Sequence, residues 1–178
     1  MANKQALREL QSRLAERMQQ VRDEPRGLSW LALDSAGLGL LVPLQQAGEI
    51  FELGALLPVP HTRPWMAGVV NLRGSVHTVV DLAQFLGLRE AAAAPPRERG
   101  AQLVAFNAAL GVNVALLIDR LLGLRHAADM APVDEAGAEA SGRPAFASWR
   151  WRDAAGRQWQ ELNLAELARS PAFLGIAA

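Results

Sequence analysis

The chain has 178 residues, of which 51% are hydrophobic and 20% charged, enough for one domain, or two small lobes, with a packed core. Eighteen basic residues balance eighteen acidic ones, which argues against the positive field of a nucleic-acid binder or polybasic membrane anchor. The absence of cysteine excludes disulfide scaffolds and thiol chemistry. With no long apolar stretch or secretory leader in this sequence, we expect a cytoplasmic protein without direct membrane insertion.

Residues 1–24 are predicted to form an amphipathic helix. Apolar residues recur every three or four positions along it, at Leu7, Leu10, Leu14, Met18 and Val21. Pro25 and Gly27 end the pattern. Two roles stay open for this helical leader. It either packs on its own domain or makes a coiled-coil-like contact with a partner or a second copy, which would give an oligomer.

After the helical leader, apolar residues recur at every second position, which is the period of a β-strand. Residues 28–33 and 38–43 predict a β-hairpin around a turn at residues 34–37. Residues 46–53 are predicted as a short helix or bend. Residues 56–60 are predicted as extended chain at an edge, because Pro58 and Pro60 remove backbone donors.

The run from Pro64 to Leu82 carries the most information. It predicts an apolar strand, an Asn-Leu-Arg-Gly corner and a returning strand that ends at Asp81, which is expected to cap a short helix. Gly68 and Gly74 are expected to meet needs of the backbone. Trp65 is expected either to anchor the strand or to line a binding pocket.

The second half of the chain predicts four further strands. Residues 102–107 and 112–118 form one pair, and residues 145–152 and 158–162 another, with loops at 89–100 and 129–144 and a short final helix. Trp149 and Trp151 share one side of a strand, and Trp159 lies across the turn. They are interpreted as core packing, with an exposed aromatic patch as the alternative.

Residues that could carry catalysis or hold a metal are scattered. His61, His77 and His126 have no second ligand at a suitable spacing, and no phosphate loop or nucleophile elbow is present. We therefore expect neither an enzyme, nor a metal site, nor a cofactor.

The motif of Gly68, Asn71–Gly74 and Asp81-Leu82 resembles the signature of CheW-like chemotaxis coupling proteins. The resemblance extends from Leu28 to Ile176. The helical leader and the ending at residues 167–174 are most similar to the branch associated with type IV pili and twitching motility.

The resemblance implies a mainly β fold of two side-by-side, five-stranded antiparallel barrels of the SH3-like kind, with a hydrophobic groove between them. The CheW-like domain would span residues 27–176. Its lobes would cover residues 36–90 and 100–162, with the first strand able to pair across lobes.

The resemblance also implies a site. Glu49 is expected to form an ion pair with Arg73 at a partner-binding surface, which the neighbouring positions complete: Ala47, Ile50, Asn71, Leu72 and Gly74. Ala47 and His77 depart from the residue types usual in the family, which bears on the choice of partner.

The implied function is a non-enzymatic adaptor. It would link the cytoplasmic tip of a methyl-accepting chemoreceptor, docked as a helical hairpin in the groove, to the regulatory domain of a CheA-like histidine kinase. A general flagellar coupling protein, a self-assembling scaffold and an enzyme on a small β-barrel are the alternatives. A module fused to a receiver domain is disfavoured because the chain has no room for one.

Overall fold

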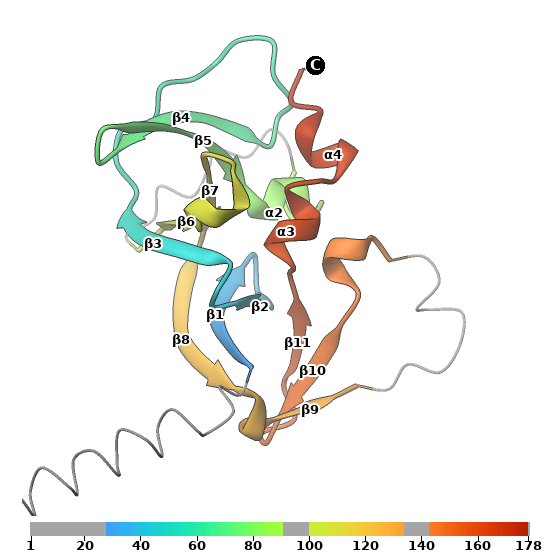
Figure 1. Cartoon of the computed structure of the whole chain (residues 1–178). Helices are drawn as coiled ribbons and strands as arrows, with labels where there is room; N and C mark the ends of the chain where they lie inside the picture. Colours follow the sequence, from blue (N-terminus) through green and yellow to red (C-terminus); the bar gives the residue numbers. More distant parts are fainter. Residues whose placement is uncertain (1–27, 91–99, 134–142, 178) are drawn as a thin grey trace, which may run out of the picture.

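The computed structural model describes residues 28–90, 100–133 and 143–177. The described chain is mainly β, with two sheets and several helices of one turn (Figure 1). The predicted helix of residues 1–24 lies outside the described residues, as do parts of both predicted long loops.

The first sheet has six strands in the order β8-β1-β2-β11-β10-β9. Neighbouring strands run antiparallel except β11 and β2, which are parallel. Side chains of β1 alternate between two apolar clusters, so almost the whole strand is buried. The strands are β1 (Ser29–Ser35), β2 (Leu38–Pro43), β8 (Arg120–His126), β9 (Met130–Pro132), β10 (Arg150–Asp153) and β11 (Gln158–Glu161).

The second sheet has five strands in the order β3-β6-β7-β5-β4. All its pairs are antiparallel except β5 and β7. Its strands are β3 (Ala47–Glu52), β4 (Met66–Leu72), β5 (Ser75–Asp81), β6 (Gln102–Phe106) and β7 (Val114–Ile118).

The division of the chain between the sheets differs from the prediction. The chain starts in the six-stranded sheet with β1 and β2, builds the whole five-stranded sheet, and then returns with β8 to β11. The predicted lobes of residues 36–90 and 100–162 therefore do not match the sheets. The sheets hold six and five strands rather than five each, because β1 pairs with both β2 and β8.

Three local predictions were wrong. Residues 46–53 contain strand β3 rather than a helix or bend, because Ile50 and Phe51 pair with β6. The segment 145–152 begins with a 3-10 helix, η3 (Ala145–Ala147), which directs Phe146 into the core. The segment 129–144 contains β9, preceded by a second 3-10 turn, η2 (Ala127–Asp129).

The short helices start at capping residues. Asp81 caps α2 (Leu82–Phe85) by accepting a hydrogen bond from the Gln84 backbone N–H at 3.1 Å, which confirms its predicted role. Asn163 caps α3 (Leu164–Leu167) in the same way. The remaining short helices are η1 (Ala108–Leu110) and α4 (Pro171–Leu174).

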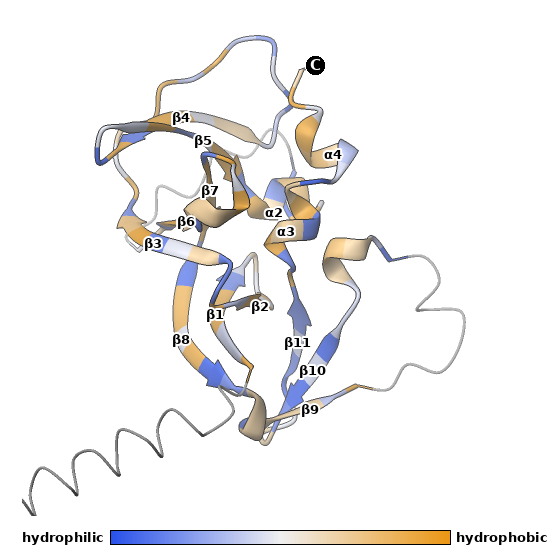
Figure 2. Ribbon diagram, in the orientation of Figure 1, coloured by the Kyte–Doolittle hydropathy of each residue, from blue (hydrophilic) through white to orange (hydrophobic). Residues whose placement is uncertain are grey.

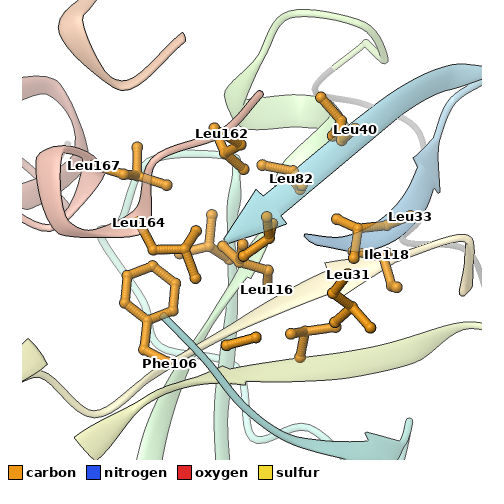
Figure 3. Close-up of a cluster of buried hydrophobic side chains, with 14 of the residues drawn as sticks. Leu31, Leu33, Leu40, Leu82, Phe106, Leu116, Ile118, Leu162, Leu164 and Leu167 are labelled. Atoms are coloured by element: carbon orange, nitrogen blue, oxygen red, sulfur yellow. The ribbon is translucent and has the colours of Figure 1, made fainter. Parts of the chain in front are cut away.

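The main core lies between the two sheets and is closed by α2 and α3 (Figure 3). Leu31 and Leu40 come from the six-stranded sheet, Leu116 and Ile118 from the five-stranded sheet, and Leu164 from α3. Each fully buried side chain of this kind contributes about 1.5–3 kcal/mol relative to an exposed one. The sheets thus share one core, which fixes the position of the surfaces described next.

Candidate partner-binding surface

The corner between β4 and β5 is a two-residue hairpin turn. Leu72 pairs with Ser75, so Arg73 and Gly74 form the loop, with φ values of 49° and 87°. Positive φ at both positions is the mark of a type I′ turn, the form that matches the twist of β-hairpins. The Asn71 side chain accepts a hydrogen bond from the Gly74 N–H at 2.8 Å. Asn71 and Gly74 thus hold the backbone that presents Arg73.

Arg73 and Glu49 form the predicted ion pair. Arg73 Nε lies 2.9 Å from Glu49 Oε2, with 77% and 53% of the two side chains exposed. The tip of the β4–β5 hairpin is accordingly hydrophilic (Figure 2). An exposed pair of this kind stabilises a fold by about 1 kcal/mol at most. The pair therefore does more to orient two charges at the surface than to hold the fold.

A hollow of about 360 Å³ lies beside this pair. His77 lines it, with ring Nδ1 3.1 Å from the Ser75 carbonyl oxygen. The other lining residues come from β3, the β4–β5 hairpin and the segments around β6 and η1: Gly48, Glu49, Phe51, Leu72, Arg73, Ser75, Ala105, Phe106, Asn107, Ala108 and Asn113.

The remaining predicted partner-binding residues differ in exposure. Ala47 packs in the main core, and Leu72 packs in a smaller core within the five-stranded sheet. These two shape the surface from beneath. Ile50 is exposed next to Glu49, and Val76, which the sequence did not single out, is exposed opposite Asn71. The corner thus combines a paired cation with apolar side chains at the surface.

Gly68 meets a need of the backbone, as predicted. It has a φ of 141°, and a Cβ at this position would lie 2.6 Å from the Leu57 carbonyl oxygen. The approach is tight because Leu57 and Val69 exchange two backbone hydrogen bonds, of 2.9 Å and 2.8 Å. The absence of a side chain at Gly68 therefore lets the extended segment before β4 pair with that strand.

A second, apolar cleft of about 560 Å³ is lined by residues of β2 and β11 and of the segments around α2, η3 and α4. Trp65 packs against the main core and also lines this cleft, whose role in binding stays a prediction. Its ring stacks on Phe173 at 6.2 Å, meets Phe85 edge-on at 5.3 Å and lines the cleft. The remaining lining residues are Leu38, Leu40, Phe85, Leu86, Leu88, Pro144, Phe146, Ala147, Gln160, Leu162, Ser170 and Ala172.

The cleft and the hollow at the corner share no lining residue. Arg73 and Glu49 therefore lie outside the lining of the apolar cleft. Ala47 does not line the cleft either. The corner with the Arg73–Glu49 pair and the apolar cleft are thus separate surfaces.

The model of the CheW-like domain family matches residues 30–172, which include both surfaces. The chain belongs to the CheW-like domain family. This confirms the resemblance seen in the motif of β4, β5 and α2.

Three curated proteins are similar to this CheW-like domain. Protein PilI of Pseudomonas aeruginosa is 26% identical over 64% of this chain and 61% of its own length. Protein FrzA of Myxococcus xanthus is 38% identical over 53% of this chain and 58% of its own. Chemotaxis protein CheW of Thermotoga maritima is 33% identical over 42% of this chain and 46% of its own. The chain thus spans about half the length of these relatives.

A solved structure supports the fold. The scaffolding protein TtCheW from Thermoanaerobacter tengcongensis superposes with a TM-score of 0.63 over 80% of this chain and 88% of its own. Its sequence is 15% identical, so the likeness concerns the fold alone.

Two classes of feature are absent from the described part of this CheW-like domain. In residues 28–90, 100–133 and 143–177, His, Asp and Glu nowhere gather in threes that could hold a metal ion. No helix within the same ranges is long and apolar enough to cross a membrane.

Sequence reasoning missed an ionic link between the sheets. Arg89 Nη1 lies 3.3 Å from Oδ2 of Asp81, and its Nη2 lies 2.7 Å from Oδ1 of Asp119. Burial acts to lower the pKa of Arg89, but the Asp119 hydrogen bond and the Asp81 charge outweigh it, so the pKa is raised. The Asp81 side chain is only 1% exposed, so its buried charge would destabilise the fold if Arg89 were not beside it. Arg89 had been assigned to a surface loop.

The three tryptophans near the C-terminus separate into two groups. Trp151 and Trp159 pair across β10 and β11 and pack with Trp30, so their predicted role in the core is confirmed. Trp149 precedes β10 and is 60% exposed. The alternative of an exposed aromatic surface therefore holds for Trp149 alone among the three.

Proposed function

We propose that this CheW-like domain is a non-enzymatic adaptor that couples a methyl-accepting chemoreceptor to a CheA-like histidine kinase. The observation that carries the proposal is the Arg73–Glu49 pair, fixed by a two-residue turn yet exposed at the surface. Membership of the family supports it, as does similarity to a relative named as a chemotaxis protein. A catalytic site would need buried, perturbed side chains rather than an exposed ion pair.

The corner is proposed to bind the regulatory domain of the kinase. Arg73, Glu49 and Ile50 would touch the partner, whereas Asn71, Leu72, Gly74 and Ala47 would keep the surface in shape. Interfaces commonly obtain most of their binding energy from a few anchors, among which arginine is enriched. The exposed side chains of Ile50 and Val76 would add apolar contact beside the charges.

The apolar cleft is proposed to bind the cytoplasmic tip of the receptor. A helical hairpin would place apolar side chains in this cleft, as in other helix-in-groove contacts. The cleft volume of about 560 Å³ could take only a few side chains, so the helix backbone would stay outside. The adaptor would act in the cytoplasm and join membrane-associated chemosensory arrays through this contact.

The pathway proposed for this adaptor controls twitching motility by type IV pili. Similarity to PilI supports this assignment. Similarity to CheW of Thermotoga maritima favours the second candidate, a coupling protein of general flagellar chemotaxis. A scaffold that only assembles with itself, through its leader, is the third candidate.

A pull-down from a lysate of the source cell tests the class of function. Three baits are compared. They are the full chain, a chain that lacks residues 1–24, and the full chain with Arg73→Glu. We expect the full chain to recover a histidine kinase and a methyl-accepting receptor, and the Arg73→Glu variant to lose the kinase. Recovery of neither protein by the full chain would contradict the proposal.

A further inference from the structure

A third recessed surface lies beside the 3-10 helix η3. Phe146 lines both the apolar cleft and this second hollow, whose volume is about 400 Å³. Its other lining residues come from η3, the start of β10, the end of β11 and α3: Ala145, Ser148, Trp149, Glu161, Asn163 and Glu166. None of them belongs to the Arg73 corner.

Trp149 stands out on this surface. Within the described residues it is the sole aromatic among the exposed large hydrophobic side chains, and 60% of it faces solvent. Its backbone is nonetheless held firmly, because its carbonyl oxygen accepts hydrogen bonds from the Glu161 N–H and from Gln160 Nε2, both at 2.8 Å. The indole is therefore presented from a fixed position, as interface anchors commonly are.

The charged residues that line the hollow are both acidic. Glu161 and Glu166 line it, and none of the lining residues is basic. Glu161 Oε2 accepts a hydrogen bond from Trp151 Nε1 at 2.7 Å, which fixes the carboxylate. Glu166 forms an exposed ion pair along α3 with Arg169, whose Nη1 lies 3.7 Å from its Oε1. A cation entering the hollow would meet two carboxylates beside an indole.

We propose that this hollow binds an arginine side chain presented by a basic segment of a partner protein. A planar guanidinium can stack on the face of Trp149 while its forked N–H groups reach Glu161, which the point charge of a lysine cannot do equally well. The same sheet already contains such a stack, because the Arg157 guanidinium lies 4.3 Å from the centre of the Trp159 ring.

The site goes beyond the proposed coupling function. The hollow shares Phe146 with the apolar cleft, but the residues that would meet the arginine, Trp149, Glu161 and Glu166, line neither the cleft nor the hollow at the Arg73 corner. The proposal of an arginine site therefore does not depend on the proposed binding of a kinase and a receptor.

Titration of the full chain with a capped tripeptide that has a central arginine tests the proposal by nuclear magnetic resonance. The five tryptophans each give one indole N–H signal, and Trp149→Phe identifies the signal of interest. The arginine peptide is expected to shift the Trp149 signal in a saturable way. A matched peptide with citrulline, which has the same shape without the charge, is expected to leave it unchanged.

The double variant of Glu161→Gln and Glu166→Gln tests the carboxylates. Glutamine keeps an oxygen that can accept the Trp151 hydrogen bond, so the fold is expected to survive. Loss of the charge-assisted hydrogen bonds should weaken binding of the arginine peptide by roughly tenfold or more. Glu52→Gln, at an exposed glutamate of β3, is the matched control and should bind as the wild type does.

Three outcomes would overturn the proposal. The first is a Trp149 signal that does not move at millimolar peptide. The second is an equal response to the citrulline peptide or in the double variant. The third is a shift that depends on protein concentration without any peptide, which would assign the hollow to a second copy of this chain.

Discussion

Arg89 Nη2 lies 2.7 Å from Oδ1 of Asp119, and this contact joins the two sheets at their boundary. Arg89 follows α2, beside the five-stranded sheet, and its guanidinium also reaches the carboxylate of Asp81 at the end of β5. Asp119 Oδ2 in turn accepts a hydrogen bond from the Ala36 N–H, at 2.6 Å, in the turn between β1 and β2. The link fixes the two sheets relative to each other and so the walls of the apolar cleft.

Replacement of Arg89 by leucine is expected to lower the free energy of unfolding by about 3 kcal/mol, because the buried Asp81 carboxylate loses its cation. Denaturant unfolding measures the change. Arg169→Leu, which removes an exposed pair with Glu166, should change stability by less than about 0.5 kcal/mol. Equal effects of the two substitutions would show that the Arg89 link does not stabilise the fold.

Gly68→Ala is expected to cost at least about 2 kcal/mol, since the new Cβ would overlap the Leu57 carbonyl oxygen and φ is unfavourable for alanine. Thermal or denaturant unfolding gives the difference. Gly54→Ala is the control, because open space surrounds that position, and it should stay within about 0.5 kcal/mol of the wild type. A tolerated Gly68→Ala would mean that the segment around Leu57 moves freely.

We expect the fold to lose stability in acid because the Asp153 carboxylate is hydrogen-bonded in the folded state. The indole N–H of Trp159 donates to it and, with the backbone N–H groups of Arg157 and Ala155, lowers the pKa of Asp153 below its ordinary value of 3.8. Because the folded pKa is depressed, this stabilisation is present above the unfolded pKa and is lost as pH falls through the folded value.

Unfolding of wild type and Asp153→Asn in denaturant, from neutral pH down to the acid limit of folding, measures this contribution. The variant is expected to be less stable at neutral pH, and the difference should shrink once the pH drops below the ordinary pKa of the carboxyl group. A difference that stays constant across this range would contradict the assignment.

Much of the local structure was predictable from the chain itself. The β1–β2 hairpin has regular alternation around a turn, and the Asn-Leu-Arg-Gly corner carries the residues that its turn type needs. The Asp81 cap and the Arg73–Glu49 pair were also predicted. These features depend on short motifs or on the resemblance to the family.

Other features depend on contacts between distant segments. β3 lacks clear alternation because its pairing with β6 is interrupted by a bulge between Ala47 and Ile50, where Gly48 approaches the backbone of Phe106. The sheet order follows from the return of β8 to β1, and Arg89 contacts a residue 30 positions away, neither of which a local pattern encodes. The separation of the corner from the cleft is a consequence of that topology.

The most direct test of the coupling account reconstitutes the histidine kinase with receptor-containing membranes and this protein, and measures kinase autophosphorylation. Wild type should make kinase activity depend on the receptor. Arg73→Ala should reduce that dependence by roughly tenfold with the fold intact, while Arg63→Ala, at an exposed arginine elsewhere, should behave as the wild type does. Receptor-independent kinase activity with wild type, or full coupling by Arg73→Ala, would contradict the account.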